Sequence, residues 1–322
     1  MKPRQLEIFL TVVEHASIHA AARALGISQP AVTKTMRELE RDLGAPLLDR
    51  SVRGVSPTRY GLALVPRARL QLENARRIQD EIKQLKDGIG GRVAIGMSTS
   101  AALTLLPPAF RIFNAKLPTA DLNLSEGIVP ALLSELEHGR LDFAVAHLRP
   151  ETTNPQLDCE VLFPVRLVVG ARRGHPLVRS RSLKNLLGAG WILPTGVATS
   201  DSVVEDFFAR QGSPLPERVI RGQSATVALA MVSNTDLLGI FVEPLALSTF
   251  PDHGIVRIDI RGPLPELMVC IVRRRGEPLT PAAELLCECF RICSRDYSNA
   301  RVKVPSVRSL TGSRIAPAAR RA

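Results

Sequence analysis

The chain has 322 residues, a formal net charge of +11 and 45% hydrophobic residues, which is enough for two or three domains with a sizeable core. It contains no run of about eighteen apolar residues, which argues against a membrane span. The opening MKPRQLEIFL lacks the apolar core and the cleavage site of a signal peptide. We therefore expect a cytoplasmic protein.

The positive charge lies at the two ends of the chain. Residues 1–87 hold 15 Lys and Arg against 10 Asp and Glu, residues 88–300 hold 21 of each, and residues 301–322 hold six basic residues and no acidic one. A basic N-terminal unit beside a neutral middle separates a part that binds a polyanion from a part with another task. The five cysteines suit a reducing compartment, and their spacing favours core thiols over a metal site.

The stretch from Ser17 to Lys34 predicts two short helices joined by a tight turn. Ser17 and Ser28 can each cap a helix N-terminus, because a serine hydroxyl accepts a backbone N–H of the opening turn. Gly26 can adopt the left-handed conformation that ends a helix, and Pro30 falls in the first turn of the second helix. This is the pattern of a helix-turn-helix, whose second helix enters the major groove of DNA.

The exposed side chains of that second helix suit base and phosphate contacts. Gln29 can make paired hydrogen bonds to a base edge, Thr33 offers a methyl group or a hydroxyl, and Lys34 and Arg37 can reach guanine or phosphate. Taken alone, the same spacing fits a helical hairpin with solvated polar residues. The pattern continues to Gly44 and is followed in residues 45–57 by two short apolar segments around a basic turn.

Residues 45–57 therefore predict a two-stranded wing, which would place Arg50 and Arg53 near the phosphate backbone. With the wing in place, the chain resembles the LysR-type transcriptional regulators. The S-Q-P-A signature of that family stands at Ser28 to Ala31, the L-E-x-x-L-G run at Leu39 to Gly44, and the wing arginine at Arg50. The resemblance extends to about residue 295 and adds Ser28, Pro30 and Ala31 to the expected DNA-binding set.

Residues 59–87 form one long helical pattern with a narrow apolar stripe, which should pair with the same stripe of a second copy. The alternative is that the stripe packs on its own chain. Family members use this helix for dimerisation and commonly form tetramers, so the resemblance implies a homo-oligomer. Pro66 should kink the helix or shift its start. Gly88, Gly90 and Gly91 break the pattern and are candidates for a hinge.

After the glycines, short apolar runs alternate with amphipathic helices, which argues for a parallel α/β sheet. Expected strands cover residues 92–97, 121–125, 141–146, 161–171, 191–193, 218–221, 238–242, 255–260 and 267–273. Expected helices cover residues 103–114, 130–137, 202–211, 226–233 and 281–293. The long run 161–171 reads as a strand that crosses to a second lobe.

The resulting organisation has four parts. Residues 1–58 form a winged helix-turn-helix DNA-binding domain, 59–87 a dimerisation helix, 88–296 a two-lobed α/β effector domain, and 297–322 a basic tail without regular structure. The two lobes resemble the effector domain of the LysR family, a fold shared with periplasmic solute-binding proteins. The expected fold is thus α/β with an all-helical type of N-terminal domain.

In α/β lobes, ligands bind beyond the carboxyl ends of strands. The expected effector-binding residues follow the predicted strands of both lobes: Ser98, Thr99, Ser100, Val129, Pro130, His147, Thr195, Thr199 and Ser202. Helix capping is the alternative role of the hydroxyls, and a lone histidine is more often structural. Ser98, Ser100 and Thr199 match the family's effector residues most directly, and the sparse charge permits an aromatic or other organic acid.

The sequence predicts a regulator rather than an enzyme. GMSTS is not the G-x-S-x-G nucleophile elbow, and the chain has no P-loop, no dinucleotide-binding glycine motif and no histidine pair at metal spacing. We therefore expect no cofactor, double-stranded DNA and a small-molecule effector as partners, contact with RNA polymerase, and residence at the nucleoid. The alternatives are a solute-binding module or enzyme tethered to DNA, and a nonspecific architectural DNA binder.

Overall fold

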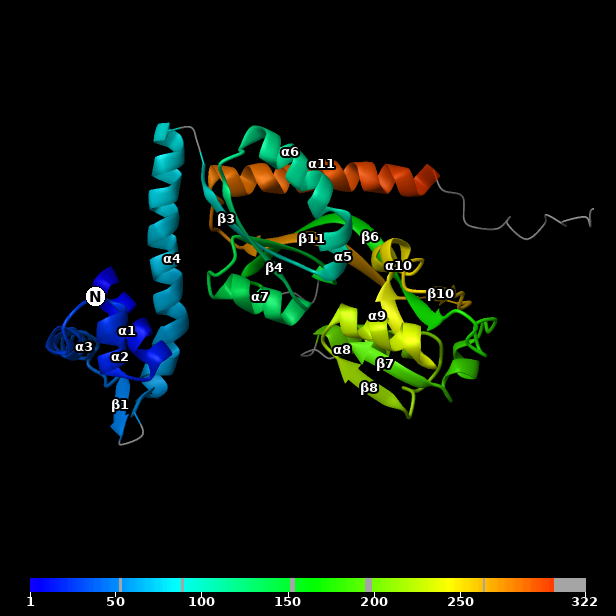
Figure 1. Cartoon of the computed structure of the whole chain (residues 1–322), viewed down its shortest axis with the longest axis horizontal. Coiled ribbons are helices and arrows are strands. Elements are labelled where there is room, and N and C mark those ends of the chain that lie inside the picture. Colours follow the sequence, from blue (N-terminus) through cyan, green and yellow to red (C-terminus); the bar gives the residue numbers. More distant parts are fainter. Residues whose placement is uncertain (52–53, 88–89, 151–153, 195–198, 263, 304–322) are drawn as a thin grey trace, which may run out of the picture.

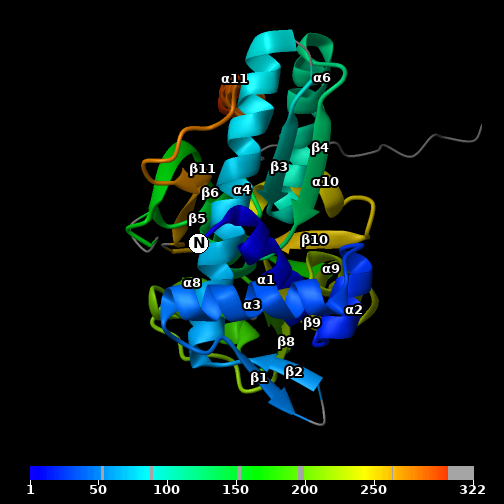
Figure 2. The ribbon, with the colours of Figure 1, turned by 90° about the vertical axis from the view of Figure 1, so that its left-hand side faces the viewer.

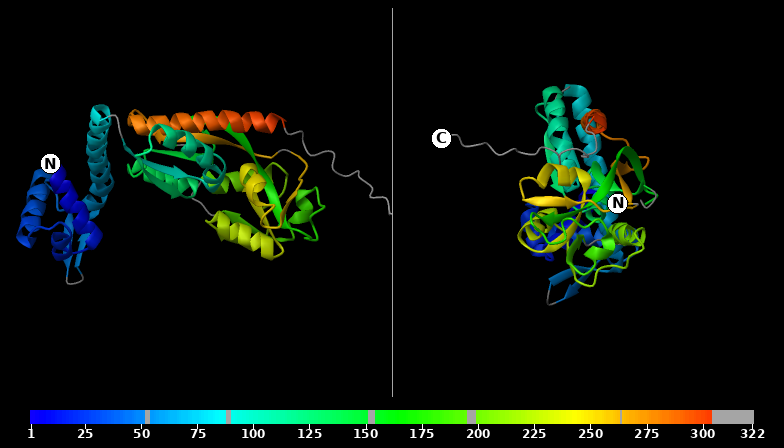
Figure 3. Two further views of the ribbon diagram at one scale, coloured as in Figure 1. Left: turned by 45° about the horizontal axis from the view of Figure 1, so that its top comes forward. Right: turned by 90° about the vertical axis from the view of Figure 1, so that its right-hand side faces the viewer.

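In this computed structural model the described residues are 1–51, 54–87, 90–150, 154–194, 199–262 and 264–303. They form a small helical unit at the N-terminus, one long helix beside it and two α/β lobes (Figure 1). The long helix stands between the N-terminal unit and the first lobe in Figure 1 and in the left-hand view of Figure 3. Among the described residues, no helix is both long and apolar enough to cross a bilayer.

The N-terminal unit contains three helices around a core of its own. They are α1 (Pro3–His15), α2 (Ile18–Ala24) and α3 (Gln29–Leu43). The predicted capping is confirmed, because Ser17 Oγ accepts a hydrogen bond from Ala20 N at 3.2 Å and Ser28 Oγ accepts one from Ala31 N at 3.4 Å. Gly26 adopts a φ of +64° in the turn between α2 and α3.

The wing is a two-stranded antiparallel sheet of β1 (Leu48–Ser51) and β2 (Gly54–Pro57). Glu40 of α3 anchors it, since its Oε1 accepts hydrogen bonds from Leu47 N at 2.8 Å and Leu48 N at 3.2 Å. These two bonds fix the start of the wing to α3. In Figure 2 it projects below the helices.

The long helix α4 (Arg59–Asp87) follows the wing directly. Thr58 caps it, because its Oγ1 accepts hydrogen bonds from Tyr60 N at 3.2 Å and Gly61 N at 3.1 Å. The helix begins before Pro66 and continues past it, so of the two predicted effects of Pro66, a kink or a shifted start, the shifted start does not occur. Of the predicted hinge glycines, Gly88 lies outside the described residues, while Gly90 and Gly91 have φ values of +81° and +132°.

One nine-stranded sheet runs through both lobes, with the strand order β4-β3-β5-β11-β6-β9-β7-β8 and β10 paired to β6. Its strands are β3 (Arg92–Met97), β4 (Asp121–Glu126), β5 (Phe143–Leu148), β6 (Leu157–Arg172), β7 (Gly190–Pro194), β8 (Val219–Gly222), β9 (Leu237–Val242), β10 (Ile255–Ile258) and β11 (Glu266–Arg274). The parallel pairing predicted for the lobes is confirmed within β4-β3-β5 and within β9-β7-β8.

The crossing strands run against that direction. β11 is antiparallel to both β5 and β6, and β6 is antiparallel to β9 and β10. The N-terminal part of β6 pairs with β11 in the first lobe, and its last residues, from Leu167, pair with β9 and β10 in the second. The sheet is therefore mixed, and a single strand belongs to both lobes.

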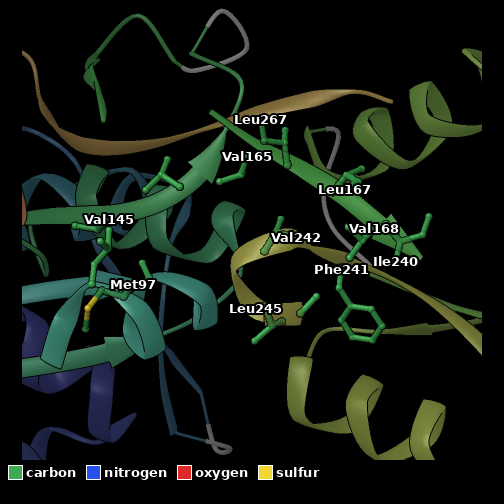
Figure 4. Packing of buried hydrophobic residues seen from close by; sticks show 14 of the residues in the cluster. Met97, Val145, Val165, Leu167, Val168, Ile240, Phe241, Val242, Leu245 and Leu267 are labelled. Atoms are coloured by element: carbon green, nitrogen blue, oxygen red, sulfur yellow. The ribbon is translucent and has the colours of Figure 1, made fainter. Parts of the chain in front are cut away.

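Helices cover the sheet in each lobe (Figure 1). They are α5 (Thr99–Thr104), α6 (Leu106–Lys116), α7 (Val129–Glu137), α8 (Thr199–Ala209), α9 (Ala225–Asn234), α10 (Glu243–Thr249) and α11 (Pro281–Lys303), with a short 3-10 helix at Leu183–Leu186. A buried apolar cluster continues from one lobe to the other, and Figure 4 shows its members from β3, β5, β6, β9 and β11.

Several predicted elements were wrong in extent. The single helix predicted over 103–114 is two helices, α5 and α6, because Pro107 and Pro108 lack the N–H groups needed to continue α5. β5 extends to Leu148, so His147 lies within the strand and does not follow it. α11 continues to Lys303, past residue 297, where the unstructured tail was predicted to begin. The helices α10 and Leu183–Leu186 were not predicted.

Candidate DNA-binding surface and effector cleft

The outward face of α3 carries a row of polar and basic side chains above a shallow groove. The groove is lined by Gln29, Pro30, Thr33, Lys34, Arg37, Glu38 and Arg41. The opposite face buries Val32, Met36 and Leu39 in the core of the N-terminal unit. These apolar residues fix the rotation of the helix about its axis. That rotation places the predicted contact residues of α3 on the surface: Gln29, Thr33, Lys34 and Arg37.

Other predicted DNA-binding residues hold different positions. The hydroxyl of Ser28 caps α3, and Ala31 is exposed in the first turn of that helix. Arg50 pairs with Val55 in the ladder of the wing, but its side chain lies outside the described residues, as does the whole of Arg53. Figure 2 shows α3 and the wing on the side of the molecule that faces away from the lobes.

A cleft of about 360 Å³ lies between the two lobes. Helix α5 of the first lobe lies against α10 of the second, and α7 lies against α8, so the cleft is bounded on two sides. Its lining includes the predicted residues Ser98, Thr99, Ser100, Val129 and His147. Apolar side chains form much of the remaining wall, and six of those labelled in Figure 4 belong to it: Leu167, Ile240, Phe241, Val242, Leu245 and Leu267.

The other four predicted effector residues are not among the described residues that line the cleft. Pro130 does not line the cleft, because it is part of the first turn of α7 while the preceding Val129 and Ile128 face the cavity. Thr195 lies outside the described residues. Thr199 and Ser202 belong to α8, but nothing of their side chains is described.

The inner end of the cleft holds a chain of three polar groups. Ser98 Oγ and Ser100 Oγ are 3.3 Å apart, and Ser100 Oγ is 3.3 Å from His147 Nδ1. Both serines are only 3% exposed, and Ser98 does not use its side chain to cap α5. Burial lowers the pKa of His147 to about 4, so its imidazole is neutral at pH 7.

Two charged groups stand nearer to the outside of the cleft. Glu126, at the end of β4, accepts a hydrogen bond from Thr99 Oγ1 at 2.5 Å. Arg149 of the first lobe reaches across to α8, where its Nη2 lies 2.5 Å from Asp206 Oδ2. Burial alone would raise the pKa of Asp206, but the hydrogen bonds and charges of Arg210 and Arg149 outweigh it and lower that pKa.

The first lobe also binds α4 through a buried arginine. Arg77 Nε lies 2.9 Å from Asp142 Oδ1, and Arg77 Nη2 donates to the carbonyl oxygens of Leu141 at 3.0 Å and Gly139 at 3.3 Å. The Nε–H is not aligned with the carboxylate, so this contact is an ion pair without a hydrogen bond. Glu277 Oε2 approaches Arg77 Nη1 at 3.4 Å.

Asp142 and Arg274 complete this junction from the lobe. The second oxygen of Asp142 accepts a hydrogen bond from Ala94 N at 2.7 Å, and Arg274 donates to the carbonyl of Leu141 and to Glu277. Desolvation raises the pKa of Asp142, although the charge of Arg77 opposes the shift. We call the four charged side chains Arg77, Asp142, Arg274 and Glu277 the linker junction.

Sequence reasoning missed the charged residues of both regions. Glu126 and Arg149 each stand at the edge of a strand that was predicted, but Asp206 reaches Arg149 from a helix 57 positions later. The linker junction joins residues up to 200 positions apart, and no local spacing marks such partners. The pairing of β11 with β5 ends at Arg273 opposite Phe143, and Arg274, the next residue, reaches the carbonyl oxygen of Leu141 just before Asp142.

Two known domain families match most of the chain. The family described as "Bacterial regulatory helix-turn-helix protein, lysR family" matches residues 3–62, and "LysR substrate binding domain" matches residues 86–292. The "HTH-type transcriptional regulator GbpR" of Azospirillum brasilense is 29% identical over 95% of this chain and 90% of its own length. The GbpR of Rhizobium radiobacter is 32% identical over 75% of this chain and 81% of its own.

Solved structures agree with these matches. The structure titled "Crystal structure of full-length CbnR complexed with the target DNA complex" is similar with a TM-score of 0.67 and 26% identity, and covers 91% of this chain and 100% of that one. Together with an exposed helix-turn-helix, a wing and a cleft between two lobes, the matches to both domain families settle the assignment. The chain belongs to the LysR family of bacterial transcriptional regulators.

Proposed function

We propose that this regulator binds promoter DNA through α3 and the wing, and that a small molecule in the inter-lobe cleft changes how two copies present these elements. The observation that carries the proposal is the linker junction. Through it α4, which follows the DNA-binding unit, is held to the first lobe of the effector domain by the ion pairs of Arg77 with Asp142 and Glu277. A ligand shifts such an arrangement only by as much as it prefers one state over the other.

The outward face of α3 supports the assignment of base contacts. Gln29, Thr33 and Arg37 recur every four residues on the exposed face of α3, and Lys34 stands next to Thr33 in the same lining. This face would present Gln29 and Thr33 to base edges. Arg50 and Arg53 of the wing are assigned to phosphates, and the signature residues Ser28, Pro30 and Ala31 to the close approach of the helix N-terminus. Such a protein would reside on chromosomal DNA in the cytoplasm and meet RNA polymerase there.

Exposed apolar side chains on α4 support dimerisation. Ile78 and Ile82 are 62% and 60% exposed and stand four residues apart, so they share one helix face that the chain itself leaves uncovered. The same face on a second copy would bury them, and two copies present two reading heads to a two-part operator. A tetramer would require a second surface in addition to this one.

Binding of the full-length chain to its own upstream intergenic DNA tests the proposal. Fluorescence anisotropy at fixed salt should give tighter binding to that DNA than to a scrambled duplex of equal length, by about a thousandfold. Equal affinity for both would leave only nonspecific attraction and would contradict the assignment. The salt slope, measured on both duplexes, separates the phosphate contribution from base reading.

A further inference from the structure

The charges around the cleft limit what the effector can carry. Among the described lining residues, the ionisable side chains are Glu126, His147 and Arg149. Within this described lining, these three side chains set the charge that a ligand meets.

Neither His147 nor Arg149 offers a positive charge to a ligand unless an existing interaction is given up. His147 is neutral at pH 7 because burial lowers its pKa to about 4. Arg149 is paired with Asp206 across the cleft at 2.5 Å, and its side chain is 18% exposed. A ligand carboxylate that reached Arg149 would have to displace Asp206 from it.

Glu126 adds a second obstacle to an acid. Its carboxylate stands at the end of β4 beside Thr99, with both on the cleft lining. A ligand carboxylate nearby would meet like charge, which is costly inside an interface. A hydroxyl group, in contrast, can donate to Glu126, because an ionised carboxylate only accepts hydrogen bonds.

The polar chain at the inner end also suits hydroxyl groups. Ser98, Ser100 and neutral His147 can each donate or accept when they rotate or change tautomer, and a ligand hydroxyl has the same versatility. The opposite wall is apolar, with Leu167, Ile240 and Phe241 among its residues. A cavity of about 360 Å³ has room for a compound of one ring.

We propose that the effector is an uncharged ring compound that carries hydroxyl groups on one edge and an apolar surface on the other, and not a carboxylic acid. This inference rests on the proposed function, because it assigns a chemical class to the ligand of the same cleft. It replaces the organic acid suggested by the sequence, since the pairing of Arg149 with Asp206 becomes visible only in three dimensions.

Matched probe pairs test the class directly. Catechol and 3,4-dihydroxybenzoate differ only by a carboxylate, as do D-xylose in its ring form and D-glucuronate. Isothermal titration calorimetry on the full-length chain at pH 7.5 should show at least one neutral member bound about tenfold more tightly than its acid. Tighter binding of either acid than of its neutral partner overturns the inference. The inference also fails if neither neutral probe binds at a concentration of roughly 10 mM.

A charge variant separates the role of Glu126 from general effects. Glu126→Gln should narrow the gap between neutral probe and acid about threefold, because it removes the like charge. Asp121→Asn removes the same charge from the other end of β4, where the side chain is 76% exposed, and should leave the gap unchanged. Equal effects of the two variants would contradict a local role of Glu126.

One further measurement separates the test of the effector's chemical class from the test of the proposed ligand-dependent change in DNA binding. Footprints of the upstream DNA are recorded with and without each bound probe. An acid that binds more tightly than its neutral partner and alters the footprint refutes the class and leaves the proposed function standing. A neutral probe that binds without any change in footprint supports the class and counts against the switch.

Discussion

Arg77 of α4 and Asp142 of the first lobe approach within 2.9 Å, with side chains only 13% and 9% exposed. This pair ties the helix that follows the DNA-binding wing to the sheet that forms the effector cleft. Two charges in such a setting are costly to bury and costlier to separate, because removal of one partner leaves the other without compensation. The pair is therefore a sensitive point for both stability and communication.

Arg77→Met should lower the free energy of unfolding by about 3 kcal/mol, since it leaves Asp142 charged and buried. The neighbouring Arg76 provides a matched control, because its side chain is 44% exposed and lies 4.0 Å from Asp80. Arg76→Met should cost less than about 0.5 kcal/mol. Urea denaturation followed by circular dichroism measures both, and similar costs for the two variants would rule out a special role of Arg77.

Gly139→Ala should disturb the same junction through backbone and contact together. Gly139 has a φ of +75°, and a Cβ there would lie 2.9 Å from Leu70 Cδ1 and 3.4 Å from Leu70 Cα of α4. Gly212 has a φ of +59° and no atom within 4 Å of its Cβ position, so Gly212→Ala isolates the backbone strain. We expect Gly139→Ala to lower the free energy of unfolding by about 1 kcal/mol more than Gly212→Ala does. Equal melting temperatures would show that α4 accommodates the methyl group.

Gln29→Ala and Arg37→Ala should weaken DNA binding in different ways. Loss of Gln29 should cost about 1–3 kcal/mol on the specific site and little on scrambled DNA, so base preference relaxes. If Arg37 contacts phosphate, its loss should weaken both duplexes alike and reduce the salt slope by about one. Anisotropy titrations at several salt concentrations distinguish these results. Unchanged selectivity in Gln29→Ala would remove Gln29 from the base-reading set.

Stability should depend on pH through His147. Burial lowers the pKa of His147 to about 4 in the folded state, against 6.5 for an ordinary histidine. Between these values the unfolded chain binds the proton and the folded chain does not, so the free energy of unfolding falls as pH drops from 6.5 toward 4. His147→Gln should reduce this slope in urea titrations at pH 6.5, 5.5 and 4.5. An identical slope in the variant would mean that other groups cause it.

Much of the local structure follows from sequence because its causes are local. Ser17, Gly26 and Ser28 mark the ends of α2 and α3, and the structure uses each of them as predicted. The first strand of the sheet, Arg92–Met97, also has the predicted bounds. Capping residues and apolar runs act over a few positions, so they are visible in the chain itself.

The candidate cleft is less predictable because its chemistry comes from distant partners. Ser98, Ser100 and His147 were expected near a ligand, and the structure brings them into one hydrogen-bonded chain. The pairing of Arg149 with Asp206 was not visible, although it decides which charge a ligand meets. Val129 and Pro130 were both predicted to bind the effector, but at the start of α7 only Val129 lines the cavity.

Strand β6 has a mechanical consequence for the response to a ligand. Because one strand pairs with β11 in the first lobe and with β9 and β10 in the second, a hydrogen-bonded strand and not a loose loop joins the lobes here. Any closing motion has to twist a hydrogen-bonded ribbon, which stores elastic strain and limits the amplitude. Occupancy of the cavity should therefore be transmitted as a small torque on the framework rather than as a wide clamshell movement.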